Sequence, residues 1–291
     1  MTTEIKKVVL YHGNCPDGFT SAWAAYQKMG DTSLYIPVHH GNPYPEEIKD
    51  AYVFILDFCY EENELREIVE KAEKVVVLDH HVSRVPVFEK LFDEGIISGE
   101  MNMNKSGAML AWEAFHPSTP APLLVEYVQD RDLWKFDLEH SGAINRCIMS
   151  YEYSFENWDH INRQLGSRDR TNDAQRSLFE NFLMDGKAIV RHQTKIIRSM
   201  AEDNKLRLTI GGIDMPAINV FYAYGSDICN YVVETTSDTV CAYFYINGRG
   251  TFNFGLRSSL DGPDVSKIAA EYGGGGHKHA SGFQVNSLND L

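Results

Sequence analysis

The stretch Val75-Val76-Val77-Leu78-Asp79-His80-His81 decides the fold, because an apolar, β-branched run is followed at once by an acid and two imidazoles. Continuous runs of this kind are typical of central strands in a parallel sheet that is covered on both faces. Two other segments have the same form: residues 53–56 followed by Asp57, and residues 8–11 followed by His12, Cys15 and Asp17. Open α/β sheets bind ligands beyond the carboxyl ends of their strands. The three segments therefore predict one rim at which oxygen and nitrogen ligands hold divalent cations.

A purely structural role for these polar residues is the competing interpretation. Asp17 comes just before a predicted helix, residues 19–29, and aspartate is a favoured N-cap residue, so either interpretation fits Asp17 alone. The Asp79-His80-His81 triplet together with Asp57 has no packing rationale, since charged groups are rarely buried without a partner. The cluster as a whole therefore favours a functional site.

Length and composition restrict the class of protein. A chain of 291 residues exceeds the size at which one core normally suffices, so we expect two domains. No apolar stretch approaches the roughly 18 residues of a membrane span, and a strand begins close to the first residue, so we expect a cytoplasmic protein without membrane contact. The five cysteines are odd in number and lack CxxC spacing, which disfavours a disulfide framework or a zinc knuckle.

The net charge of −14 bears on the binding partner. Such a surface opposes the binding of long duplex nucleic acid, which requires an extended basic face. A small anion remains compatible with it, because bound metal ions reverse the local potential.

Alternating patterns along the chain predict an α/β fold in three parts. A βαβ rhythm predicts an N-terminal parallel-sheet domain with flanking helices, residues 1–160. Helical spacing of apolar residues predicts a helical connector, residues 161–204. Strand-rich patterns and the Asn247-Gly248 turn predict a smaller C-terminal α/β domain, residues 205–291.

Four consecutive glycines, residues 273–276, precede His277 and exceed what the end of a helix requires. We infer that something approaches this backbone closely. The N–H groups of a glycine-rich turn form an anion nest, to which Arg257 and His277 can add donors for a phosphate or carboxylate. A flexible turn is the alternative for a bare glycine run, and the attached His277 disfavours it.

Two motifs resemble those of the DHH phosphoesterases. Leu78-Asp79-His80-His81 resembles the family signature, and the sequence Gly-Gly-Gly-His-Lys-His-Ala-Ser-Gly-Phe at residues 274–283 is similar to the GGGHxxAxGF motif of the associated C-terminal domain. The motifs occur in the family order, about 200 residues apart, and the resemblance extends over most of the chain. It implies an N-terminal DHH metal-binding domain and a C-terminal substrate-binding domain, as in nanoRNases and pAp phosphatases.

The resemblance also implies roles for individual residues. Metal ions would be held by the side chains of His12, Asp17, Asp57, His80 and Asp130. Asp57 would bridge two ions, Asp79 would orient the imidazole of His80, and His81 would face the substrate. Asp132 is a rival for the role of Asp130. The spacing of the two residues to Trp134 and Phe136 favours Asp130. Substrate binding in the C-terminal domain would fall to Arg257, Gly275, Gly276 and His277.

One position departs from the family pattern. Where the family reads Asp-x-Asp-Gly, this chain reads Cys15-Pro16-Asp17-Gly18, so that a soft thiol replaces a hard carboxylate. His12 also lies three residues before that position instead of the usual four. Three possibilities follow. Either Cys15 is a ligand of the first ion, or His12 is the only ligand on that side of the ion, or the first ion binds weakly or is absent. The other site survives in every case.

The leading hypothesis is therefore a manganese-dependent phosphoesterase with one or two Mn²⁺ ions, and with Mg²⁺ as the alternative ion. It would hydrolyse phosphodiester or phosphomonoester bonds of short single-stranded oligonucleotides or small nucleotides by metal-activated water. An inorganic pyrophosphatase or exopolyphosphatase is the alternative enzyme. A catalytically silent nucleotide-binding sensor is the alternative class, because of Cys15. A homodimer is compatible with each of these.

Overall fold

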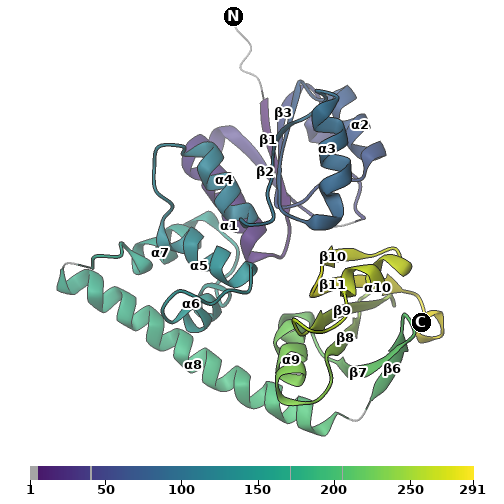
Figure 1. Cartoon of the computed structure of the whole chain (residues 1–291). Helices are drawn as coiled ribbons and strands as arrows, with labels where there is room; N and C mark the ends of the chain where they lie inside the picture. Colours follow the sequence, from purple (N-terminus) through teal and green to yellow (C-terminus); the bar gives the residue numbers. More distant parts are fainter. Residues whose placement is uncertain (1–5, 40, 171, 205) are drawn as a thin grey trace, which may run out of the picture. The chain divides into compact units, whose positions relative to one another are not determined.

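The computed structural model describes residues 6–39, 41–170, 172–204 and 206–291 (Figure 1). The chain divides into two compact units, Met1–Val190 and Arg191–Leu291. Each unit contains one sheet flanked by helices, and the first sheet is parallel. The predicted α/β class, with a parallel sheet first and a second sheet at the C-terminus, is thus confirmed.

The first sheet is built from the apolar runs that the sequence singles out. Its five parallel strands have the order β2-β1-β3-β4-β5. In chain order they are β1 (Lys6–His12), β2 (Ser33–Val38), β3 (Ala51–Leu56), β4 (Lys74–Asp79) and β5 (Ser98–Met101). Val8, Val53 and Val77 on the three central strands are fully buried. Burial on both faces explains why these strands read as continuous apolar runs.

Helices cover both faces of this sheet (Figure 1). One hydrophobic core contains residues of α1 (Pro16–Met29), α4 (Gly107–Phe115), α5 (Leu123–Asp132), α6 (Ser141–Ile148) and α7 (Phe155–Leu165). A second core contains residues of α2 (Glu62–Lys71) and α3 (Val85–Asp93). Short 3₁₀ turns occur at Gly30–Thr32, Glu46–Ile48 and Val82–Arg84. The carboxyl edge of the sheet is therefore framed by helix termini and loops.

The predicted connector contains one long helix, α8 (Asp173–Asp203). Phe179, Phe182 and Leu183 in its first half belong to a core of the first unit, and Ile197 belongs to a core of the second. The division between the units falls within this helix. Lys205, where the predicted C-terminal domain begins, lies outside the described residues.

The second unit has a mixed six-stranded sheet of order β10-β11-β9-β8-β7-β6. Its strands are β6 (Arg207–Ile210), β7 (Ile213–Asn219), β8 (Val240–Ile246), β9 (Phe252–Ser258), β10 (Gly275–His277) and β11 (Ala280–Val285). α10 (Val265–Glu271) shares one core with Phe254, Leu256 and Phe283, while α9 (Tyr222–Thr235) shares another with Cys241. A short 3₁₀ turn, Leu288–Asp290, follows the last strand. The hairpin predicted around Asn247-Gly248 joins β8 to β9.

Two further findings concern the chain as a whole. All five cysteines are free thiols. Within the part of the chain that the structure describes, no helix is both long enough and apolar enough to cross a bilayer.

Candidate metal centre

The carboxyl ends of three neighbouring strands bring the predicted ligands together. His12 is the last residue of β1, Asp57 follows β3 directly, and His80 follows β4. Asp57 has a φ of 63°, in the left-handed region. That conformation costs free energy for a residue other than glycine, and it tends to persist at functional sites.

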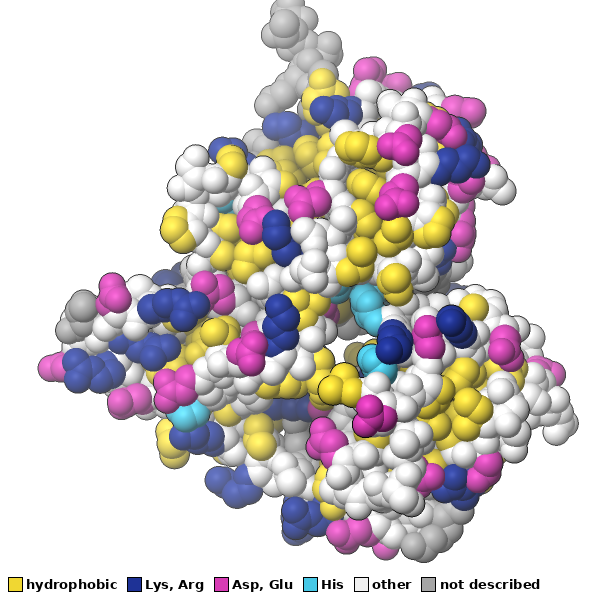
Figure 2. Space-filling model, in the orientation of Figure 1, with side chains coloured by type: hydrophobic (Ala, Val, Ile, Leu, Met, Phe, Trp, Pro, Cys, Tyr) yellow, Lys and Arg dark blue, Asp and Glu magenta, His cyan; other side chains and the backbone are white. Residues whose placement is uncertain are grey.

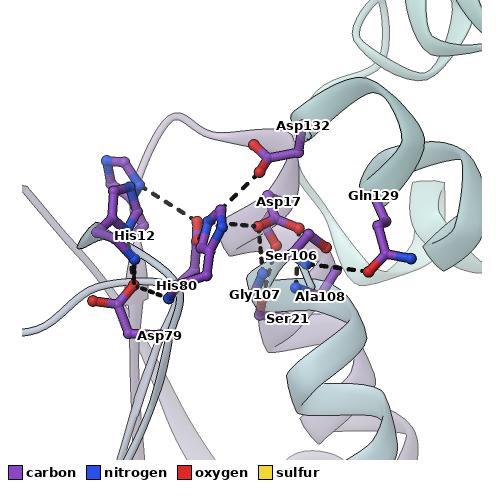
Figure 3. A network of polar contacts seen from close by, with 12 residues as sticks. His12, Asp17, Ser21, Asp79, His80, Ser106, Gly107, Ala108, Gln129 and Asp132 are labelled. Carbon is purple, nitrogen blue, oxygen red and sulfur yellow. Dashed lines mark hydrogen bonds and ion pairs between the residues drawn. The ribbon is translucent and has the colours of Figure 1, made fainter. Parts of the chain in front are cut away.

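His80 lies among three carboxylates (Figure 3). Its Nε2 atom is 3.2 Å from Asp57 Oδ1, 3.6 Å from Asp17 Oδ2 and 3.5 Å from Asp132 Oδ2. On the other side, His12 Nδ1 lies 3.4 Å from Asp57 Oδ2. Asp57 therefore directs one oxygen to each imidazole, which is the position that a carboxylate bridging two ions requires.

These side chains supply two groups of donor atoms. The donor atoms of Asp17, His80 and Asp132 lie within 4.8 Å of one another, and those of His12, Asp57 and His81 form a second group with the same limit. Mixed carboxylate and imidazole donors suit first-row divalent ions better than an all-oxygen set would. Each group is therefore a candidate site for one cation.

The N-terminus of α4 holds the carboxylate of Asp17. Asp17 Oδ2 accepts a hydrogen bond of 2.7 Å from the N–H of Gly107, and Oδ1 accepts one of 2.9 Å from Ala108. The first N–H groups of a helix lack partners within the helix and favour a negative charge. Asp17 does not cap its own helix, because Cys15 occupies the N-cap position of α1. The structural alternative for Asp17 is that it caps a helix. Its carboxylate does lie at a helix N-terminus, but that helix is α4, which is distant in the sequence, and not the helix α1 that contains Asp17.

Two glycines allow this close packing. A Cβ atom on Gly107 would lie 2.5 Å from the Cβ of Asp57, and one on Gly18 would lie 2.2 Å from the carbonyl oxygen of His12. Neither position can carry a side chain without displacing the cluster. Sequence reasoning missed Gly107, and the available signal was a Ser-Gly pair directly before an apolar helix.

Burial and mutual charge determine the protonation of the cluster without metal. Burial raises the pKa of Asp17, and the charges of Asp57 and Asp132 raise it further. Burial alone would lower the pKa of His80, but its hydrogen bond to Asp57 and the charges of Asp132, Asp57 and Asp17 outweigh this and raise it to about 11. Burial would raise the pKa of Asp57, yet its contacts with His12 and His80 hold it well below its usual range. The positive charge in the cluster is thus too small to balance three carboxylates. A divalent cation would supply the missing charge.

The bonding of the buried donor atoms also fits a metal. Among the described residues, His12 Nδ1 and Asp57 Oδ2 have no hydrogen-bond partner although both atoms are buried. Buried polar atoms in native proteins are normally paired, so each exception requires an explanation. A cation between the imidazole and the carboxylate would satisfy both atoms.

The carboxylate of Asp79 contacts both histidines of the triplet. Its Oδ1 atom accepts a 2.7 Å hydrogen bond from the backbone N–H of His80, and the same oxygen lies 2.7 Å from Nδ1 of His81. Asp79 is fully buried. Burial would raise its pKa, but the contact with His81 outweighs this and lowers it. The carboxylate of Asp79 is therefore placed to orient the ring of His81, and it also accepts the backbone N–H of His80.

Asp130 and its rival Asp132 have different partners in the structure. The carboxylate of Asp130 accepts hydrogen bonds from the N–H groups of Asp137 at 2.9 Å and Leu138 at 3.2 Å, in the loop after α5. Asp132, one half-turn further along the helix, faces His80 instead. Among the described residues, Asp132 and not Asp130 belongs to a candidate donor group, so the rival named by the sequence lies beside His80.

The glycine run of the second unit forms an edge strand. Gly275, Gly276 and His277 make up β10 and pair with β11. The N–H groups of Gly273 and Gly274 donate to carbonyls at the end of α10, so these two do not form the expected anion nest. A Cβ atom on Gly276 would lie 2.6 Å from the carbonyl oxygen of Ala280, so close approach of β11 explains that glycine.

Arg257 and His277 share one row of the second sheet. Ala280 of β11 pairs with Arg257 of β9 on one side and with His277 of β10 on the other. Directly paired residues of antiparallel strands project to the same face, so Arg257 and His277 flank Ala280 on one surface. Arg257 Nη2 donates a hydrogen bond of 2.6 Å to Ser226 Oγ of α9. Two of the predicted substrate-binding side chains thereby lie on one face of the sheet, on either side of Ala280.

Comparison with known proteins identifies two relatives by sequence, while no family model matches the chain. The uncharacterized protein R106 of Acanthamoeba polyphaga mimivirus is 28% identical over 305 residues, covering 97% of this chain and 68% of that protein. The oligoribonuclease NrnB of Bacillus subtilis strain 168 is 24% identical over 255 residues, covering 82% of this chain and 61% of that protein. The alignments thus span about two thirds of the length of these relatives.

Three solved structures resemble the chain over most of its length. An uncharacterized protein from Helicobacter pylori G27 has a TM-score of 0.44 at 16% identity, covering 99% of this chain and 96% of that one. The pGpG-specific phosphodiesterase PggH from Vibrio cholerae has a TM-score of 0.44 at 13% identity, covering 97% and 93%. An exopolyphosphatase-related protein from Bacteroides fragilis has a TM-score of 0.48 at 14% identity, covering 98% and 88%. Together with the acid and imidazole cluster on a parallel sheet, the two sequence motifs and the Bacillus relative support the resemblance of the chain to the DHH phosphoesterase family.

Proposed function

We propose that the chain hydrolyses phosphate ester bonds of short oligonucleotides or small nucleotides at a centre of two divalent cations, with Mn²⁺ as the natural ion. The observation that carries this proposal is the position of Asp57, with one oxygen toward His80 and the other toward His12. The ions, when bound, would lower the pKa of a water molecule and neutralise charge on the phosphoryl oxygens. Manganese is preferred to magnesium because imidazoles belong to both donor groups.

The roles of the side chains follow from their contacts. Asp17, His80 and Asp132 would hold one ion, and His12 with Asp57 would hold the other. We assign the Nδ1 proton of His81 to its contact with buried Asp79. That tautomer leaves Nε2 of His81 to exchange a proton with a phosphoryl or leaving oxygen.

Cys15 affects how tightly the site at His12 would bind an ion. Burial raises the pKa of the Cys15 thiol, and the charge of Asp57 raises it further, against a smaller lowering by His12. The thiolate is the form that binds metals, so a thiol with a raised pKa is a weak ligand near neutral pH. We therefore propose that the ion at His12 and Asp57 binds more weakly than the ion at Asp17, His80 and Asp132.

The substrate class is proposed from charge and from the Bacillus relative, which is an oligoribonuclease. On the face shown in Figure 2, Lys and Arg side chains are interspersed with Asp and Glu. A net charge of −14 likewise disfavours long duplex nucleic acid. In the C-terminal unit, the row with Arg257 and His277 is proposed to bind a phosphate of the substrate.

A cytoplasmic location is proposed on chemical grounds. All five cysteines are free, which suits a reducing compartment. A homodimer remains compatible with the proposal, and its test is the mass of the protein in solution.

The proposal is tested by a manganese-supplemented screen of a dinucleotide, pAp, a cyclic dinucleotide and pyrophosphate. We expect cleavage of at least one nucleotide substrate, and a loss of more than about 100-fold in the variant Asp57→Asn. The matched control is Asp93→Asn, which changes an exposed carboxylate at the end of α3. Cleavage of pyrophosphate alone would favour the pyrophosphatase alternative. Manganese binding without cleavage of any phosphate ester or anhydride would favour the silent sensor.

A further inference from the structure

The loop that joins α5 to α6 (Figure 1) carries two exposed aromatic residues, Trp134 and Phe136. Trp134 and Phe136 are 43% and 39% exposed, and their rings contact edge to face with centroids 4.9 Å apart. Both residues have a left-handed backbone, with φ values of 55° and 53°. Bulky residues rarely adopt this conformation, which is costly unless the surroundings enforce it.

Asp130 enforces the conformation of this loop. Its carboxylate accepts the N–H groups of Asp137 and Leu138, and its carbonyl oxygen accepts those of Lys135 at 2.9 Å and Phe136 at 3.3 Å. Asp130 itself is buried. A buried acid thus anchors a loop that leaves two large aromatic side chains partly exposed to solvent.

The pair is tied to the metal centre by the chain itself. Asp132 faces His80, with Oδ2 3.5 Å from Nε2, and Trp134 follows only two residues later. Two residues span at most about 7 Å between Cα atoms. The Cα atom of Trp134 therefore lies within about 7 Å of the Cα atom of Asp132, and that of Phe136 within about 14 Å.

We propose that Trp134 and Phe136 form a stacking platform for a base of the substrate whose phosphate is attacked at the metal centre. The inference rests on the proposed function and deepens it by naming the nucleobase as the group that is recognised. Every base has a π face, so stacking adds affinity with little dependence on sequence. Inorganic pyrophosphate and polyphosphate have no such group, so the platform would select nucleotides over inorganic phosphates.

The test compares a diadenosine dinucleotide with an analogue that has the same sugar-phosphate chain but no bases. Trp134→Asn removes the ring while keeping a residue that tolerates the left-handed backbone. We expect kcat/KM for the dinucleotide to fall about tenfold or more, and kcat/KM for the abasic analogue to stay within about twofold. Trp134→Phe retains a ring and should recover most of the loss. Phe136→Asn provides an independent variant of the same design.

The matched control is Phe92→Leu. Phe92 is 46% exposed and lies near the end of α3, where the helix has run back from the carboxyl edge of the sheet. This variant should leave both substrates unaffected.

The inference fails if Trp134→Asn and Phe136→Asn leave kcat/KM for the dinucleotide unchanged, or lower it equally for the abasic analogue. Either outcome can occur while the native protein cleaves the dinucleotide, and the proposed function then stands. If the native protein cleaves neither substrate, the proposed function fails and the platform is tested by binding alone. Adenosine monophosphate should then quench tryptophan fluorescence in the native protein and less in Trp134→Asn, and equal quenching overturns the inference.

Discussion

The backbone N–H of Gly107 donates a hydrogen bond of 2.7 Å to the carboxylate of Asp17, 90 residues earlier in the chain. This contact joins the N-terminal turns of α1 and α4 at the edge of the sheet (Figure 3). Asp17 is 1% exposed and lies near the carboxylates of Asp57 and Asp132, so its charge requires compensation. The helix terminus supplies part of it, because its N–H groups and its dipole favour an anion. The remainder is available to a cation.

Gly107→Ala should disturb the cluster without removing any polar group. The new Cβ would lie 2.5 Å from Asp57 Cβ and 2.7 Å from Asp57 Oδ1, so α4 or Asp57 must move. We expect a loss of about 1–3 kcal/mol in the free energy of unfolding, as for other overpacked sites, and weaker Mn²⁺ binding. Urea unfolding and calorimetric titration with Mn²⁺ measure the two effects. Gly142→Ala in α6 is the control, because its Cβ would meet no atom within 4 Å, and it should not destabilise the protein.

Asp132→Asn and Asp130→Asn should separate metal binding from loop structure. Asp132 lies 3.5 Å from His80, so its replacement should weaken Mn²⁺ binding by at least about tenfold. Asp130 accepts two backbone N–H groups, so its replacement should lower stability by about 1–3 kcal/mol and leave Mn²⁺ affinity nearly unchanged. Mn²⁺ titration and urea unfolding of both variants decide the question. The reverse pattern would restore Asp130 as the ligand.

The central strands could be predicted from the sequence because burial on both faces produces a local pattern, an uninterrupted run of apolar residues. Residues 53–56 and 75–78 are apolar without interruption, and they form most of β3 and β4. β10 could not be predicted in this way. Glycine has no side chain to show alternation, so the run at residues 273–276 was interpreted as a turn, while its pairing with β11 depends on residues further along the chain.

In the candidate site, too, some positions could be predicted from the local sequence, while others depend on contacts between distant segments. His12, Asp57 and His80 each occur at a strand end, and parallel strands end at one edge, so their proximity followed from topology. Asp130 and Asp132 lie on one helix, two residues apart, and only the packing of α5 decides which of them faces His80. Their function as metal ligands remains a prediction, which the variants above address.

Asp79→Asn should lower turnover while leaving metal binding largely intact. Asparagine retains an oxygen that can accept the N–H of His80, but it removes the charge that holds Nδ1 of His81 at 2.7 Å. Partners of this kind typically contribute a factor of about 10–100. We expect kcat for a dinucleotide to fall within that range and Mn²⁺ affinity to change by less than about threefold. An equal loss of affinity and kcat would show instead that Asp79 acts on the ions through His80.

Binding of Mn²⁺ should release protons and strengthen as the pH rises. Burial would lower the pKa of His80, but Asp57, Asp132 and Asp17 raise it to about 11, so this imidazole is protonated at pH 7 in the metal-free protein. A metal binds the neutral imidazole, so the ion must displace that proton, and the affinity should rise by about tenfold per pH unit for each proton displaced. The sign follows because the proton stabilises the metal-free form at every pH below the raised pKa.

Calorimetric titrations near pH 7, in two buffers that differ in ionisation enthalpy, count the protons released for each Mn²⁺ ion bound. We expect at least about one proton per ion in the native protein. His140→Gln is the control, because His140 is exposed and its ring contacts Glu139 rather than the cluster. Proton release should persist in this variant and decrease in His80→Gln. Tight binding to the native protein without proton release would contradict the prediction, since the ion would then leave the protonated imidazole of His80 in place and bind elsewhere.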